Sequence, residues 1–175
     1  MPENATSDSS PLINLFLIDR FSLLKEFFKQ ITIPEAVWQE LVETDKAGVE
    51  FFKQERESGF LVIKKIEPSA FLSLLYRELD RGEAEAISLA LNNKAEILLV
   101  DEKEARSIAR EYQLPLTGVV GILLRAKLEQ KIPSLRRELQ LLRDNGFWID
   151  DELCSEATRA CGEKWDSQRP RENVS

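Results

Sequence analysis

Apolar and polar residues alternate along this chain in two ways, at the 3.6-residue period of a helix and in short continuous apolar runs. The helical period predicts helices over residues 12–17, 21–28, 35–44, 71–80, 83–93, 102–113, 119–130, 134–145 and 150–162, and a further helical stretch between residues 44 and 59. The short runs predict strands over residues 31–34, 59–66, 95–101 and 114–118. The run "AEILLVD" at 95–101 has the continuous apolar core of a parallel strand that is covered on both faces. Strands that alternate with helices predict an α/β fold with a mostly parallel central sheet.

Composition adds little to this picture. With 175 residues, 43% of them hydrophobic and 31% charged, the chain is typical of one soluble globular domain. No apolar run approaches the ~18 residues of a membrane span, and the N-terminus lacks the layout of a signal peptide. Cys154 and Cys161 form no CxxC pair, so we expect free thiols in a reducing cytoplasm. The polar residues 163–175 predict a disordered tail.

Missing residue types and motifs restrict the chemistry more strongly. The sequence has no histidine, which excludes Ser-His-Asp and Cys-His nucleophile systems and most zinc sites. None of its seven glycines belongs to a phosphate-binding loop motif. The net charge of −7 argues weakly against nucleic acid, because a local basic patch can coexist with carboxylates gathered around a metal.

Acidic residues at the ends of strands are the first candidates for a site, because open parallel sheets bind ligands at the carboxyl ends of their strands. Asp101 directly follows "ILLV" and meets this condition. Asp8 meets it if a first strand precedes the helix that follows. For an isolated aspartate in this position, a helix cap is the more common role.

Helical geometry separates Glu83 from Glu85, at about 100° per residue. Glu85 falls on the polar face of the helix, so we predict that it is at the surface. Glu83 points towards the apolar side, where a carboxylate is costly unless a cation compensates it. Glu40 lies on the flank of the apolar stripe of its helix, where a place in the site and a solvated position are equally compatible with the pattern.

The candidate site therefore consists of carboxylates alone, from Asp8, Glu40, Glu83 and Asp101. Oxygen ligands suit Mg²⁺ or Mn²⁺, and crowded carboxylates without a cation would take up protons instead. A metal site of this kind suggests hydrolysis of phosphodiester bonds, for which no histidine is needed.

At these residues the sequence resembles the PIN-domain nucleases, in the prokaryotic branch related to VapC-type toxins. The matching segments, in chain order, are Asp8 with the "SSPLINL" that follows it, "IPEAVWQEL", "LDRGEAEAISLAL", "AEILLVDEKEAR", "LPLTGVVGILLRAK" and "LRDNGFWIDDEL". The resemblance covers about residues 5–162, which we therefore predict to form a single PIN-like domain. It implies a three-layer α/β/α sandwich with a parallel sheet.

The same resemblance implies a Mg²⁺- or Mn²⁺-dependent endoribonuclease, held inactive by a cognate antitoxin and often a homodimer. By motif position, Asp8, Glu83 and Asp101 match the metal-binding acids, and Glu40 matches the acid of the second helix. Thr117 lies where some members place a hydroxyl near the site, although an ordinary strand-end threonine is at least as common.

The N-terminus departs from the family pattern, because "MPENATS" stands where this branch has an apolar strand. Three explanations are compatible with this departure. The first strand is shortened to Ala5–Ser7, the start codon is misassigned, or the site is degenerate. The last possibility keeps open a second hypothesis, a PIN-like module that binds protein or RNA without cutting. A phosphotransfer or nucleotide-binding protein is a weaker third hypothesis, supported only by Lys103 near Asp101.

Two further groups of residues have alternative roles. Some cations could contact phosphates, although each alone is more often plain surface charge; these are Arg106, Arg110, Arg125 and Lys127. Several aromatic residues could serve a dimer or an antitoxin, although most are expected in the core; these are Phe16, Phe27, Phe28, Phe51 and Phe52.

Overall fold

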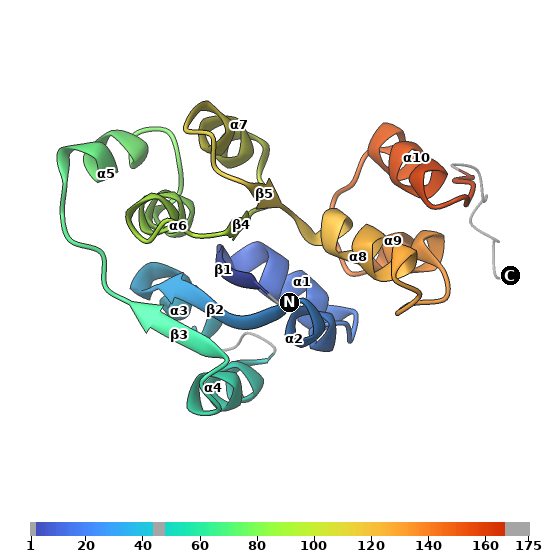
Figure 1. Cartoon of the computed structure of the whole chain (residues 1–175), viewed down its shortest axis with the longest axis horizontal. Helices are drawn as coiled ribbons and strands as arrows, with labels where there is room; N and C mark the ends of the chain where they lie inside the picture. Colours follow the sequence, from blue (N-terminus) through green and yellow to red (C-terminus); the bar gives the residue numbers. More distant parts are fainter. Residues whose placement is uncertain (1–2, 44–47, 167–175) are drawn as a thin grey trace, which may run out of the picture. The chain divides into compact units, whose positions relative to one another are not determined.

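The computed structural model describes residues 3–43 and 48–166 (Figure 1). Within these residues the strands form one five-stranded sheet in the order β3-β2-β1-β4-β5, and every neighbouring pair is parallel. The strands are β1 (Glu3–Ser7), β2 (Phe28–Pro34), β3 (Leu61–Lys64), β4 (Ile97–Leu99) and β5 (Leu116–Thr117). The predicted parallel sheet is thereby confirmed.

The chain divides into two compact units, Met1–Val119 and Val120–Ser175. The helices that begin before Val119 are α1 (Ser9–Leu17), α2 (Ser22–Phe27), α3 (Glu35–Leu41), α4 (Val49–Glu57), α5 (Ala70–Leu75), α6 (Arg81–Asn92) and α7 (Lys103–Glu111). The second unit contains α8 (Val119–Leu128) from its second residue, α9 (Leu135–Asp144) and α10 (Asp151–Ala160).

Helices cover both faces of the sheet in the first unit. Figure 1 shows α5, α6 and α7 on one side of the row of strands and α2 and α4 on the other side. The core beneath α6 is built from its apolar side and from β4, with Ile87, Ala90, Leu98 and Val100 all buried. This arrangement confirms the predicted three-layer α/β/α sandwich.

The polar N-terminal segment forms the central strand of the sheet. β1 lies between β2 and β4, and its pairing with β4 uses Ala5, Thr6 and Ser7. All three are buried, and the Ser7 hydroxyl donates a hydrogen bond of 2.7 Å to the carbonyl of Asp8. The expectation that this sequence would not suit a full central strand was wrong, because small side chains fit under both helix layers and the strand's backbone groups bond to both neighbours.

The phenylalanines before residue 61 confirm the prediction that most of them belong to the core. Phe27, Phe28 and Phe52 are almost completely buried. The rings of Phe16 and Phe51 are half-buried and pack with their centroids 5.0 Å apart. β2 begins at Phe28, which was predicted to be the last residue of a helix. The apolar pattern did not distinguish the two, because a buried aromatic ring suits a strand as well as a helix.

In the second unit, the chain beyond α10 returns to the start of α9. The carboxylate of Glu163 accepts hydrogen bonds from the backbone N–H groups of Leu135 and Arg136, at 2.9 and 2.8 Å. The indole of Trp165 donates to Asp151 at 2.9 Å. Of the tail predicted over 163–175, residues 167–175 lie outside the described residues. No helix in the described part of the chain combines the length and apolar composition that a membrane crossing requires.

Candidate active site

The sheet delivers two of the four candidate acids to one edge. Asp8 follows the last residue of β1, and Asp101 lies two residues beyond the end of β4. The two strands are parallel neighbours with Ser7 paired to Leu99, and the backbone N–H of Asp8 donates to the Leu99 carbonyl at 3.0 Å. Asp8 and Asp101 therefore leave the sheet side by side at the carboxyl ends of their strands.

Glu40 approaches Asp8 from α3, and both carboxylates lie against Gly82 in the first turn of α6. A Cβ atom built on Gly82 would be 3.2 Å from Oδ1 of Asp8 and would overlap Oε1 of Glu40. The other oxygen of Glu40 accepts a hydrogen bond from the hydroxyl of Ser9. The absence of a side chain at residue 82 thus leaves room for two acids from different elements.

Asp101 is held by hydrogen bonds from two sides. Its Oδ1 accepts the backbone N–H of Val119 at 2.8 Å, and its Oδ2 accepts the hydroxyl of Ser10 at 3.3 Å. A Cβ atom on Gly118 would overlap Oδ1 of Asp101 and lie 3.0 Å from Nη1 of Arg106. Asp101 therefore occupies a fixed position between the end of β5 and the start of α1.

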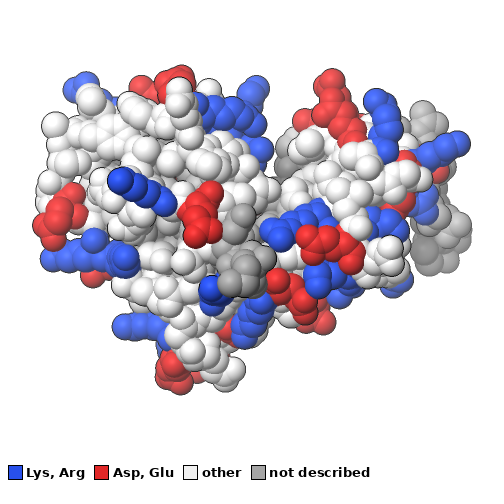
Figure 2. All heavy atoms as spheres, in the orientation of Figure 1, with Lys and Arg blue, Asp and Glu red and all other residues white. Residues whose placement is uncertain are grey.

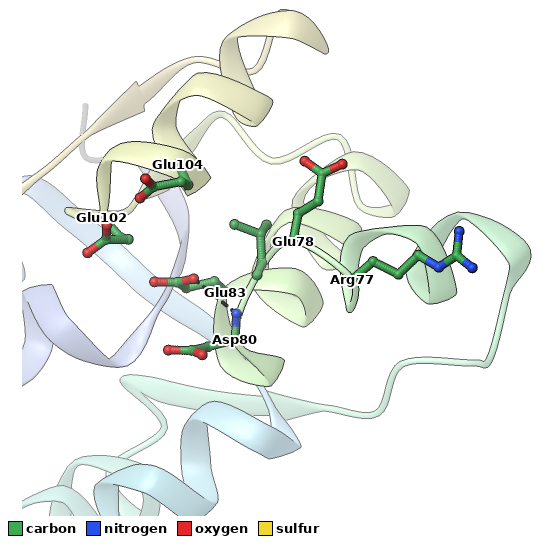
Figure 3. A pocket seen from close by; sticks show the side chains of 7 residues that line it. Arg77, Glu78, Asp80, Glu83, Glu102 and Glu104 are labelled. Atoms are coloured by element: carbon green, nitrogen blue, oxygen red, sulfur yellow. Dashed lines mark hydrogen bonds between the residues drawn. The ribbon is translucent and has the colours of Figure 1, made fainter.

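Glu83 lies beside this cluster rather than inside the apolar side of α6. Its side chain is half-buried, and its Oε2 accepts the backbone N–H of Asp80 at 3.3 Å, as one half of a capping box. It borders a pocket of about 390 Å³ whose lining is mainly acidic, from Arg77, Glu78, Leu79, Asp80, Glu83, Glu102 and Glu104. Figure 3 shows the carboxylates of Asp80, Glu83 and Glu102 turned towards the same opening, while Arg77 points away from it.

Burial raises the pKa of three of these acids. The pKa of Asp8 rises to about 7, mainly because the carboxylate is desolvated; the backbone N–H of Ser9 opposes the shift, and the charges of Glu40, Glu83 and Asp101 add to it. Desolvation also raises the pKa of Glu83 to about 7 and that of Asp101 to about 6. Burial therefore favours proton uptake by these acids, and neighbouring carboxylates add to it for Asp8 and Glu83, unless a cation is bound.

The donor set suits a hard divalent cation, because it consists of carboxylate and hydroxyl oxygens. Over residues 3–43 and 48–166, no three Asp, Glu, Cys or His side chains are arranged so that they could already hold a metal ion. The chemistry of the donors thus fits Mg²⁺ or Mn²⁺, while ligation by Asp8, Glu83 and Asp101 together remains a prediction.

Several residues near these acids were not identified from the sequence. The hydroxyls of Ser9 and Ser10 contact Glu40 and Asp101, although "DSS" was visible as a hydroxyl-rich stretch. The spacing of Asp80 and Glu83, three residues apart at a helix start, was a readable signal for a capping box. No sequence signal for close approach distinguished Gly82 and Gly118 from other glycines.

Glu85 lies on the other side of α6, and its predicted surface position was wrong. Only 5% of the residue is exposed. The helical pattern placed it correctly away from Ile87, but it could not reveal that α3 covers that side of α6.

Three of the four cations considered for phosphate contacts, all except Arg110, have other partners. Arg106 is half-buried and donates to the Val100 carbonyl at 3.0 Å, and desolvation lowers its pKa. In the second unit, Arg125 pairs with Glu129, and Lys127 pairs with Glu163. Figure 2 shows Lys and Arg interspersed with Asp and Glu on the face that it presents. These contacts agree with the alternative role as structural or surface charge.

Comparison with known proteins gives one family match. A family model described as a PIN domain, DUF3368, matches residues 4–163. No curated protein matches the sequence. The matched range includes all four candidate acids, and a PIN domain is a nuclease-type fold. Because the match covers nearly the whole chain, the protein belongs to the PIN-domain family.

Proposed function

We propose that this protein is a Mg²⁺- or Mn²⁺-dependent endoribonuclease of the VapC-related branch and acts in the cytoplasm as the toxin of a toxin–antitoxin pair. The observation that carries the proposal is the approach of Asp8 and Glu40 to one point over Gly82. Asp101 leaves the sheet beside Asp8, and Glu83 follows Gly82 directly. The ends of β1 and β4 and the helices α3 and α6 therefore meet near one edge of the sheet, which supports the proposal.

The four acids have two roles in the proposed reaction. Asp8, Glu83 and Asp101 would hold the cation, and the hydrogen bonds from Val119 and Ser10 fix the orientation of Asp101. When bound, Mg²⁺ or Mn²⁺ supplies an activated water and stabilises negative charge on the phosphate. Glu40 keeps one oxygen fixed by Ser9, and its Oε1 would accept a proton from the attacking water.

The raised pKa of Asp8 supports a role in cation binding. With a pKa of about 7, this carboxyl is partly protonated near neutral pH and becomes fully ionised at little cost when a divalent cation compensates it. Three partners accompany the proposal: single-stranded RNA as substrate, a cognate antitoxin, and a second copy of the chain in a homodimer.

The decisive experiment is RNA cleavage by the purified protein in Mg²⁺, in Mn²⁺ and in EDTA. Glu83→Gln is compared with wild type and with Glu57→Gln, a control that removes an exposed carboxylate at the end of α4. We expect cleavage that requires metal, disappears in Glu83→Gln and persists in Glu57→Gln. Cleavage that survives EDTA or the Glu83 substitution would overturn the proposal.

The second candidate is a PIN-like module that binds RNA or protein without cutting it. One observation favours it, namely that the described acids form no ready-made group of three metal ligands. Thermal unfolding with and without Mn²⁺ separates the two candidates. A protein that neither cuts RNA nor gains stability from Mn²⁺ would be assigned to the module.

A further inference from the structure

Glu85 is a buried charge that the proposed reaction does not use. It lies in the second turn of α6 with a side-chain exposure of only 7%, two residues after Glu83. A buried carboxylate is costly unless hydrogen bonds and an opposite charge compensate it. Its surroundings therefore indicate what it contributes.

Three elements of the first unit donate hydrogen bonds to this carboxylate. Its Oε1 accepts the hydroxyl of Tyr76, at the end of α5, at 2.7 Å, and Nε of Arg81, at the start of α6, at 3.0 Å. Its Oε2 accepts the backbone N–H of Ala36, in the first turn of α3, at 3.3 Å. Glu85 thus connects α3, α5 and α6.

The contact with Ala36 replaces a missing helix cap. The N-cap position of α3 is occupied by Pro34, whose side chain has no hydrogen-bond acceptor. The first N–H groups of a helix have no partner within the helix, and a carboxylate at that end also interacts favourably with the helix dipole. Glu85 supplies this carboxylate from a different helix, so the start of α3 is attached to α6.

The two helices that Glu85 joins carry the acids of the candidate site. α3 presents Glu40, and α6 presents Gly82 and Glu83. Glu40 reaches so close to Gly82 that no Cβ atom fits between them. A small shift of α3 along α6 would therefore move Glu40 away from Asp8.

We propose that Glu85 is a positioning residue of the nuclease site, which fixes α3 against α6 and thereby holds Glu40 beside Asp8 and Gly82. The inference rests on the proposed function for its effect on cleavage. Its effect on α3 rests on the hydrogen bonds to Ala36, Tyr76 and Arg81 and is independent of that function.

The test compares Glu85→Gln with Glu163→Gln. Glu163 is a matched control, because it also caps a helix from a distant segment, through Leu135 and Arg136, and also pairs with a cation, Lys127. It belongs to the second unit, which carries none of the candidate acids. Both substitutions remove one buried or half-buried charge and keep the size of the side chain.

We expect Glu85→Gln to lower kcat by roughly tenfold to a hundredfold with KM for RNA within about twofold, because displacing a reacting group by about 1 Å has effects of this size. Glu163→Gln should lower the unfolding temperature by a similar amount and leave kcat unchanged. A kcat unchanged in Glu85→Gln, or lowered equally in both variants, would overturn the proposed positioning role.

Hydrogen–deuterium exchange gives a readout that does not depend on catalysis. Glu85→Gln should speed exchange over residues 35–41, which form α3, while Glu163→Gln leaves that segment unchanged. Unchanged exchange over α3 in Glu85→Gln would refute the attachment. If the wild-type protein does not cut RNA, the proposed function fails, and the exchange measurement still decides whether Glu85 holds α3.

Discussion

Gly82 lies in the first turn of α6, where a side chain would enter the space now occupied by two carboxylates. A Cβ atom there would overlap Oε1 of Glu40 and lie 3.2 Å from Oδ1 of Asp8. Replacing Gly82 with alanine should therefore have little effect on folding and a large effect on activity, and the size of each can be worked out.

For folding, the two contributions are small and of opposite sign. Alanine is favoured over glycine within a helix by about 0.5–1 kcal/mol. Against this gain stands the displacement of the Glu40 carboxylate, which costs little because it is the far end of a flexible side chain. The free energy of unfolding of Gly82→Ala should therefore remain within about 1 kcal/mol of the wild-type value.

For activity, displacement of Glu40 is not offset by any gain. A reacting group moved by about 1 Å typically loses on the order of a hundredfold in rate, which corresponds to about 2.7 kcal/mol of transition-state stabilisation. We expect the Gly82→Ala protein to fold normally and to cut RNA about a hundredfold more slowly in Mg²⁺ or Mn²⁺.

The assay measures kcat/KM for RNA cleavage and urea unfolding for four proteins: wild type, Gly82→Ala, Glu40→Ala and the double variant. With the Glu40 carboxylate already removed, the alanine at residue 82 should cause almost no further loss of activity and should stabilise α6. Wild-type cleavage by Gly82→Ala, or equal additional losses in both backgrounds, would refute the reasoning.

Three other predictions concern the same edge of the sheet. Because the pKa of Asp8 is raised from 3.8 to about 7 on folding, the folded state binds more protons than the unfolded state between these two values, so stability falls as pH rises across that range. In EDTA, Asp8→Asn should therefore raise the free energy of unfolding by about 2–4 kcal/mol at pH 8 and by far less at pH 4. Urea titrations that show destabilisation at both pH values would contradict this. Mn²⁺ should raise the unfolding temperature more at pH 8 than at pH 5, as differential scanning calorimetry can measure, because protons and the cation compete for the same carboxylates. Gly118→Ala should cost about 1–3 kcal/mol in urea unfolding and also lower activity, since its Cβ would lie 3.1 Å from the Val100 backbone carbonyl, which cannot move as a side chain can; a stability equal to wild type would contradict this prediction.

Much of the fold was accessible from the sequence, because the strands covered on both faces carry continuous apolar runs. The order of strands and helices, the parallel sheet and the place of Asp101 after β4 followed from such runs together with the helical period of the segments between them. β1 escaped this reasoning because burial in a central strand requires small side chains with satisfied hydrogen bonds, which Ala5, Thr6 and Ser7 provide without being strongly apolar.

The local geometry of the site was less accessible. A helical projection of α6 describes directions around one axis and contains no information on the neighbours in those directions. It therefore placed Glu85 at the surface, although α3 covers that side. The close approach at Gly82 depends on the distance between α3 and α6, which is likewise a property of two packed helices rather than of either sequence segment.

The hydrogen bonds also distinguish Asp8 from Glu83 and Asp101. Glu83 caps α6, and Asp101 accepts the N–H of Val119 at the start of α8, so each makes hydrogen bonds that orient neighbouring backbone, although burial raises the pKa of both carboxyls. Asp8 occupies the N-cap position of α1, yet its side chain makes no capping hydrogen bond. It is buried beside Glu40, and both burial and the neighbouring charge raise its pKa. The backbone N–H of Ser9 offsets this shift only in part, so the ionised carboxylate lowers the stability of the metal-free fold at and above neutral pH. Asp8 is therefore the acid whose position most strongly indicates a bound cation, and its substitution should separate the stability of the fold from its activity most clearly.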